Sequence, residues 1–182
     1  MKKIIMTVGF LLTLQVSMMA QNWPAGVTFV ESKANDSVTV SGDLATGKII
    51  EDLSWASSSS NACFTGLQFN QYMGNHVFFA TIIKPGTVIK IYATPDNTEE
   101  EISLYGYMLG EKEIQMVPNL AQCITCEADY KRSRPMKGKT LSYVREMEFR
   151  NPTKNTYNII IGVSAPKGVT DRKFSLMVKT IS

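Results

Sequence analysis

Several features that are common in enzymes are scarce in this sequence of 182 residues. It has one histidine, two tryptophans and three cysteines. It contains no Gly-x-Ser-x-Gly, His-Glu-x-x-His or phosphate-loop motif, and "SGDL" at Ser41 has its serine on the wrong side for a Gly-Asp-Ser-Leu hydrolase. The lone His76 is more typical of a structural position than of a catalytic base. Paired carboxylates of the glycosidase type leave no local signature, so a small hydrolase stays open.

The sequence also lacks an apolar run long enough to span a membrane. Its first apolar run, residues 4–14, follows Lys2 and Lys3 and precedes a short polar stretch that ends at Ala20. This order is that of a secretory signal peptide. We expect cleavage after Ala20 and export to the periplasm or the extracellular space. The first mature residue would be Gln21, which argues against a lipid anchor on cysteine.

Removing the 20 signal residues from 182 leaves 162, which suit one domain with a sizeable core. We divide the mature chain into N-terminal strands with a Ser-rich connector at 21–60 and a β-sandwich domain at 61–182. One domain over 21–182 is the alternative. Taking Lys2 and Lys3 from the 19 basic residues leaves 17 against 16 acidic ones. This balance gives no reason to expect a nucleic acid or an anionic membrane as partner.

Apolar residues recur with a period of two rather than at helical spacing, and the runs are rich in β-branched and aromatic residues. Turn residues such as "KPGT" separate the runs. The pattern predicts an all-β fold, an antiparallel two-sheet β-sandwich or jelly roll. Strands are expected at 27–30, 37–41, 48–51, 76–83, 88–94, 102–109, 141–149, 157–165 and 173–180.

The second half of the chain, from about residue 75 to residue 180, contains "FFATIIKPGTVIKIYAT", "EEEISLYGY", "NTYNIIIGVSA" and "KFSLMVKT" in that order. These stretches resemble the bacterial pre-peptidase C-terminal domain, a β-sandwich appended to many secreted hydrolases. The resemblance implies a noncatalytic domain linked to secretion, stability or substrate attachment. Two features depart from the family pattern. Glu101 and Ser103 stand where the family has an Asp pair, and residues 111–139 form an insertion.

A Cys-x-x-Cys pair, Cys123 and Cys126, lies in that insertion beside a run of basic residues. A redox site would need the pair to open a helix, and a c-type haem would need a histidine next. A zinc site would need Cys63 and His76 to converge on the pair. In an exported protein a disulfide is the simpler interpretation. We predict Cys123 with Cys126, because this ring needs no assumption about tertiary structure, with Cys63 as the alternative partner. One thiol is left over in either arrangement and is expected to be buried.

Two groups of residues are candidates for ligand binding. Basic residues after the Cys pair would suit an acidic polysaccharide, a lipopolysaccharide phosphate or an acidic protein, with a solvated loop as the alternative. Tyr105 and Tyr107 share one strand face, and Lys90 and Tyr92 are expected on the neighbouring strand. Such a face suits stacking of sugar rings, although a second buried face with tyrosine at its rim is the interpretation we prefer. The basic group comprises Lys131, Arg132, Arg134, Lys137 and Lys139.

The loop "PDNTEEE" gathers oxygen-bearing side chains that suit calcium, although it lacks the alternation of a recognised calcium loop. We therefore prefer a solvated turn followed by a strand and expect no cofactor, with calcium as the alternative. The candidate ligands are Asp96, Asn97, Glu99 and Glu101.

These observations favour a secreted, noncatalytic β-sandwich that binds a surface ligand, either a polysaccharide or a cell-surface protein. One alternative is a structural or assembly subunit of the bacterial cell envelope that has no small ligand. A second alternative is a small hydrolase that uses carboxylates we cannot identify from the sequence.

Overall fold

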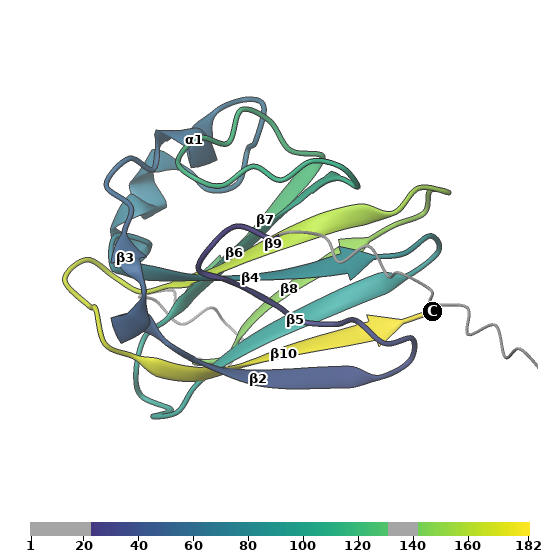
Figure 1. Cartoon of the computed structure of the whole chain (residues 1–182). Coiled ribbons are helices and arrows are strands. Elements are labelled where there is room, and N and C mark those ends of the chain that lie inside the picture. The colour runs from purple at the N-terminus through teal and green to yellow at the C-terminus, as the bar shows by residue number, and fades with distance from the viewer. Residues whose placement is uncertain (1–22, 131–141) are drawn as a thin grey trace, which may run out of the picture.

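The computed structural model describes residues 23–130 and 142–182 as a mostly β fold with two sheets packed face to face (Figure 1). The signal-peptide prediction therefore lies outside the described residues. The strands are β1 Val27–Phe29, β2 Ser37–Asp43, β3 Lys48–Ile49, β4 Asn75–Ile83, β5 Val88–Pro95, β6 Ser103–Gly110, β7 Thr125–Tyr130, β8 Arg145–Arg150, β9 Tyr157–Ser164 and β10 Lys173–Ile181. The short helices are η1 Leu44–Thr46, α1 Ser54–Ser57 and η2 Gly66–Gln71.

Sheet A has the order β1-β4-β9-β6-β7, and β3 also pairs with β4; sheet B has the order β2-β10-β5-β8. The predicted two-sheet sandwich is thus confirmed. Among the described residues every ladder is antiparallel except that of β1 with β4. A parallel pair needs a long connection. The chain provides one here, because it passes through β2, β3 and α1 before it reaches β4.

The alternating pattern of the strands builds the core between the sheets. On β5, Ile89, Ile91 and Ala93 point inward and are fully buried, while the residues between them are partly exposed. The same alternation places Phe174 and Leu176 of β10 in this core. The period of two in the sequence therefore identified the inward face of sheet B correctly.

Sheet A buries its second face as well, under two segments at 50–72 and 111–124 that we call the mantle. Figure 1 shows α1 and the neighbouring loops above β6 and β7. A second hydrophobic core lies between the mantle and the sheet. Trp55 is its centre, with ring centroids 5.5 Å from Tyr105 and 5.6 Å from Phe64.

The N-terminal region takes part in both sheets. β1 pairs with β4 of sheet A, and β2 pairs with β10 of sheet B along its whole length. The Ser-rich stretch, predicted as a flexible connector, instead forms α1 and a turn, because Trp55 and Ala56 bury their side chains in the second core. Where the chain divides into separately folding units stays a prediction.

Candidate binding groove

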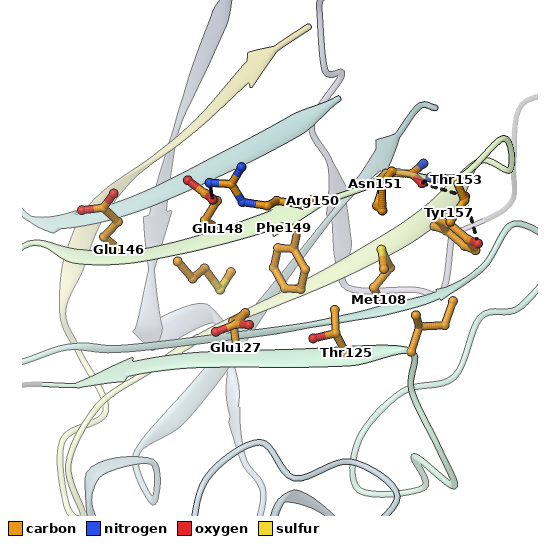
Figure 2. A pocket seen from close by; sticks show the side chains of 13 residues that line it. Met108, Thr125, Glu127, Glu146, Glu148, Phe149, Arg150, Asn151, Thr153 and Tyr157 are labelled. Carbon is orange, nitrogen blue, oxygen red and sulfur yellow. Dashed lines mark hydrogen bonds and ion pairs between the residues drawn. The ribbon is translucent and has the colours of Figure 1, made fainter. Parts of the chain in front are cut away.

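A groove lies between β7, the last strand of sheet A, and β8, the last strand of sheet B (Figure 2). At one end of the groove, the Asp129 side chain of β7 connects the two strands. Its Oδ2 accepts a hydrogen bond from the Glu146 backbone N–H at 2.9 Å, and its Oδ1 lies 3.9 Å from Arg145 Nη1. Toward Thr125 and Arg150 the groove opens to a volume of about 730 Å³.

Strand alternation gives the groove an apolar floor and a charged rim. Met147 and Phe149 of β8 point into the core and are 4% and 1% exposed, while Glu146 and Glu148 between them face outward. On β7, Cys126 faces the mantle, so Glu127 faces the gap between the sheets. The floor is therefore apolar and closely packed, the exposed apolar surface of the groove comes from Ile124 at its edge, and the rim carries carboxylates.

The carboxylates of the rim differ in their partners. Glu148 lies 3.3 Å from Lys90 Nζ and 2.5 Å from Arg150 Nη2, and Glu146 lies 3.9 Å from Lys90 Nζ. The hydrogen bond to Glu148 raises the pKa of Lys90. Burial, and next the charge of Glu148, raise the pKa of the Glu127 carboxyl. A nearby cation from a ligand would relieve this cost for Glu127.

A hydrogen-bonded turn closes the far end of the groove. Asn151 is 1% exposed, and its Oδ1 accepts hydrogen bonds from the Thr153 backbone N–H at 3.1 Å and from the Thr153 hydroxyl at 2.8 Å. The Thr153 oxygen also lies 3.1 Å from the Tyr157 hydroxyl. These bonds hold the end wall in one arrangement (Figure 2).

The predicted aromatic face is not available to a ligand. Tyr105 and Tyr107 are 0% exposed, because the mantle covers the face of β6 on which they lie. Burial raises the pKa of both phenols, and the Tyr107 hydroxyl donates to the Gln115 carbonyl at 2.9 Å. The assignment of these two residues to ligand binding was therefore wrong, and the second buried face is what the structure has.

Lys90 and Tyr92 do not lie beside the two tyrosines, as the sequence suggested, because β5 belongs to sheet B and β6 to sheet A. Both side chains are on the outer face of sheet B and are partly exposed. Burial, and next the charge of Glu146, raise the pKa of Tyr92. The two residues thus adjoin the groove rim through Glu146 and Glu148. Their role in binding stays a prediction.

The remaining predicted ligand sites find less support. The basic group from Lys131 to Lys139 lies outside the described residues. Within the described ranges, no group of three or more His, Cys, Asp or Glu side chains is arranged to hold a metal ion. In the loop predicted for calcium, Asn97 instead accepts a hydrogen bond from the Glu99 backbone N–H at 3.2 Å.

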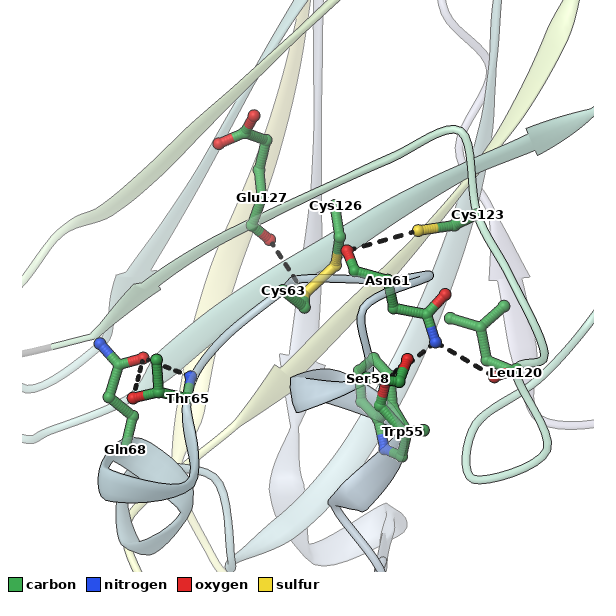
Figure 3. Close-up of a disulfide and its surroundings, with 10 residues drawn as sticks. All are labelled: Trp55, Ser58, Asn61, Cys63, Thr65, Gln68, Leu120, Cys123, Cys126 and Glu127. Carbon is green, nitrogen blue, oxygen red and sulfur yellow. Dashed lines mark hydrogen bonds between the residues drawn. A yellow bond between two sulfur atoms is a disulfide. The ribbon is translucent and has the colours of Figure 1, made fainter.

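The disulfide joins Cys63 to Cys126 rather than Cys123 to Cys126 (Figure 3). The preferred local pairing was therefore wrong, and the alternative partner is the one used. Cys126 points from β7 toward the mantle, where Cys63 lies with a Cα–Cα distance of 4.9 Å, which suits a disulfide. Cys123 is a free, half-buried thiol 3.8 Å from the Asn61 carbonyl oxygen, and burial raises its pKa.

Sequence reasoning missed the groove, because β7 lies in the insertion at 111–139, where no strand was predicted. The only signal was the alternation in "REMEF", which sets Glu146 and Glu148 opposite in direction to Met147 and Phe149. That pattern marks a half-buried strand, but it does not tell an edge strand from a central one.

No protein-family model matches the chain, and no curated protein matches it closely. Among solved structures, the chain is similar to PliG, a periplasmic inhibitor of g-type lysozyme from Aeromonas hydrophila, at 12% identity and a TM-score of 0.40. That match covers 85% of this chain and 96% of the other. At this identity a match concerns the fold alone.

The pre-peptidase C-terminal domain of a collagenase from Bacillus anthracis is similar at 12% identity and a TM-score of 0.40, over 87% of this chain and 100% of that domain. The match spans more than the second half in which the sequence resemblance lies. CorA, a surface-associated copper-binding protein of Methylomicrobium album BG8, is similar at 11% identity and a TM-score of 0.39, over 85% and 98% of the two chains.

No helix within residues 23–130 and 142–182 is long and apolar enough to cross a membrane.

Proposed function

We propose that this protein is an exported, noncatalytic β-sandwich that binds a macromolecular ligand at the cell surface through the groove between β7 and β8. The observation that carries the proposal is the groove itself, which combines an apolar floor with a charged rim. Binding sites commonly combine an apolar centre with a polar edge. The Cys63–Cys126 disulfide supports export, because such bonds persist in oxidising compartments.

A protein ligand fits this site better than a polysaccharide. Sugar rings stack on exposed aromatic faces, and the two tyrosines that would have provided such a face are buried. The groove instead offers apolar surface on Ile124, which is 52% exposed, beside the nearly buried Met108 and Met147 of its floor. Protein interfaces commonly surround an apolar centre with a polar rim.

The test is retention of cell-envelope fractions and of insoluble polysaccharides on the immobilised mature protein, at low and high salt. We expect envelope protein to be retained by the wild type and lost with Glu127→Lys. Glu31→Lys makes the same charge change at an exposed site that does not line the groove, and it should retain the ligand. Retention of a glycan instead would make a polysaccharide, rather than a protein, the ligand of the groove. Retention of nothing would favour a structural or assembly subunit.

A hydrolase is the second candidate, and one observation favours it. Glu127 has its carboxyl pKa raised by burial and by the charge of Glu148, which is the environment of a general acid beside an ionised carboxylate. If this is the function, the protein hydrolyses a polysaccharide, and Glu127→Gln abolishes turnover without weakening substrate binding. Absence of turnover on every polysaccharide that the protein retains would remove this candidate.

A further inference from the structure

The strand β8 has one edge that pairs with β5 and one that faces the groove. The ladder pairs Met147 with Ile91 and Phe149 with Ile89, and the Asn151 N–H donates to the Thr87 carbonyl at 2.9 Å. Asn151, Phe149 and Met147 therefore direct their backbone N–H and C=O groups toward β5. The residues between, Glu148 and Arg150 among them, direct their N–H and C=O groups toward the groove.

The hydrogen bond from the Glu146 N–H to Asp129 shows the same alternation from the other side. This N–H points away from β5, toward β7, and it is bonded at 2.9 Å. Glu148 and Arg150, two and four residues farther along, have the same direction. No strand among the described residues pairs with β8 at this edge. An edge with unpaired backbone groups can accept a further strand.

Side chains on each side of β8 specify what a strand added there would carry. The residue opposite Glu148 would lie on the outer face of sheet B, where the carboxylates of Glu148 and Glu146 favour lysine or arginine. The residue opposite Arg150 lies on the same face, where the guanidinium favours a neutral side chain. Residues opposite Met147 and Phe149 would point into the groove, where the floor favours apolar side chains. Glu127 on the far wall adds negative charge on that side.

We infer that the groove takes an extended segment of a partner protein as an added strand on β8, with apolar side chains toward the floor and a basic side chain opposite Glu148. The inference rests on the proposed function and identifies its ligand as a protein segment. Backbone hydrogen bonds to Glu148 and Arg150 would supply affinity, and the alternating side chains would supply specificity, as in other cases of strand addition.

An octapeptide of alternating threonine and valine, with lysine in place of one central threonine, is a direct probe, measured by calorimetry on the mature protein at low salt. We expect this lysine peptide to bind and its counterpart with glutamate in place of the lysine to bind more weakly. If the strand adds antiparallel, the lysine opposite Glu148 and the threonine opposite Arg150 are the residues whose amides face β8. N-methylation of the lysine and threonine amides should then weaken binding about tenfold or more, since it removes several hydrogen bonds. N-methylation of the valine amides, which face away, is the matched control.

Amide hydrogen exchange locates the peptide on the protein. We expect the Glu148 and Arg150 amides to gain protection when the peptide binds. The Met147 and Phe149 amides are bonded to β5 already and should not change. Glu146→Gln should weaken binding a few-fold, because an exposed ion pair contributes little, and Glu31→Gln should have no effect.

Each negative result has a distinct meaning. Equal binding by the two methylated peptides would overturn strand addition and leave charge attraction alone. No binding by the lysine peptide would overturn the inference. The charged side chains of β8 would then serve to protect this edge against pairing with other strands. The proposed function would survive either result if wild-type protein still retained envelope protein and Glu127→Lys did not.

Discussion

His76, the one histidine of the chain, is a buried residue of β4 whose ring faces the mantle. Its Nε2 lies 2.7 Å from the Tyr72 carbonyl oxygen and its Nδ1 lies 2.9 Å from the Tyr105 hydroxyl. A carbonyl oxygen only accepts, so Nε2 carries the proton and Nδ1 accepts from Tyr105. The neutral ring therefore satisfies both partners. Burial lowers the pKa of His76 to about 4.

This environment predicts that the protein loses stability in mild acid. The pKa of His76 is 6.5 in the unfolded chain and about 4 in the folded one, so the unfolded state binds more protons between these values. Stability is complete above about pH 6.5 and falls as the pH falls toward 4. We expect a loss of about 2 kcal/mol between pH 7 and pH 5, measured by urea unfolding.

The control for this prediction is His76→Gln, which should be less stable at pH 7 but should lose this dependence on pH. Titration of the single histidine by NMR gives a direct check, with a midpoint near 4. A midpoint near 6.5 would contradict the buried position of the ring.

A second prediction at the scale of one residue concerns the loss of stability when Gly162 on β9 is replaced. It is the cross-strand partner of Tyr105, and a Cβ built on it would lie 2.2 Å from Tyr105 Cζ. The tyrosine is fully buried against Trp55 and Phe64, so moving it aside would disturb the packing of both rings. Gly162→Ala should lower the free energy of unfolding by about 1–3 kcal/mol or more in a thermal or urea melt.

Gly66→Ala is the matched control, because no atom lies within 4 Å of a Cβ built there. This change should leave stability within about 0.5 kcal/mol of the wild type. A neutral Gly162→Ala would mean that Tyr105 can adopt another position.

At the scale of elements, the disulfide fastens the mantle to β7. It joins residues separated by 63 positions, so it removes much freedom from the unfolded chain. Cys63→Ser should therefore cost about 4 kcal/mol of stability. Cys123→Ser is the control and should cost little, because this half-buried thiol forms no disulfide.

Alkylation of the denatured, unreduced protein tests the pairing itself. Modification should occur at one cysteine, which peptide mapping should identify as Cys123. Modification of all three would show that no disulfide forms, and modification of Cys63 would restore the local pairing of Cys123 with Cys126.

The elements differ in how well the sequence predicted them. Strands such as β5 and β10 show clear alternation, because one face is buried and the other is not. The sequence also placed Tyr105 and Tyr107 on the face of β6 opposite to the core. It did not show that the mantle covers that face, since Trp55 and Phe64 lie in a stretch of serines and turns without periodicity.

The groove could not be predicted for a related reason. It depends on β7 and β8 being the outermost strands of different sheets, and strand order is a property of tertiary pairing. Alternation predicted the directions of the β8 side chains but not their neighbours across the gap. The same limit applied to Cys63, whose partner lies 63 positions away.

At the scale of the whole molecule, sheet A is the common wall of two cores. Phe79 and Ile161 belong to the core between the sheets, while Phe78 and Ile160, their chain neighbours, belong to the core under the mantle. Loss of the mantle would therefore expose one face of the central strands of sheet A to water. Because apolar exposure is costly, the two cores should be lost together.

This arrangement predicts one cooperative unfolding transition for mantle and sandwich. In a Trp23→Phe variant, fluorescence reports on Trp55 in the mantle alone, while far-ultraviolet circular dichroism reports on the sheets. The two signals should change at the same urea concentration, as two-state unfolding requires. If the fluorescence changes first, the mantle unfolds separately and the core beneath it does not couple to the sandwich. Coincidence that persists after reduction of the disulfide would show that packing on Tyr105 and Tyr107, rather than the covalent bond, joins the two.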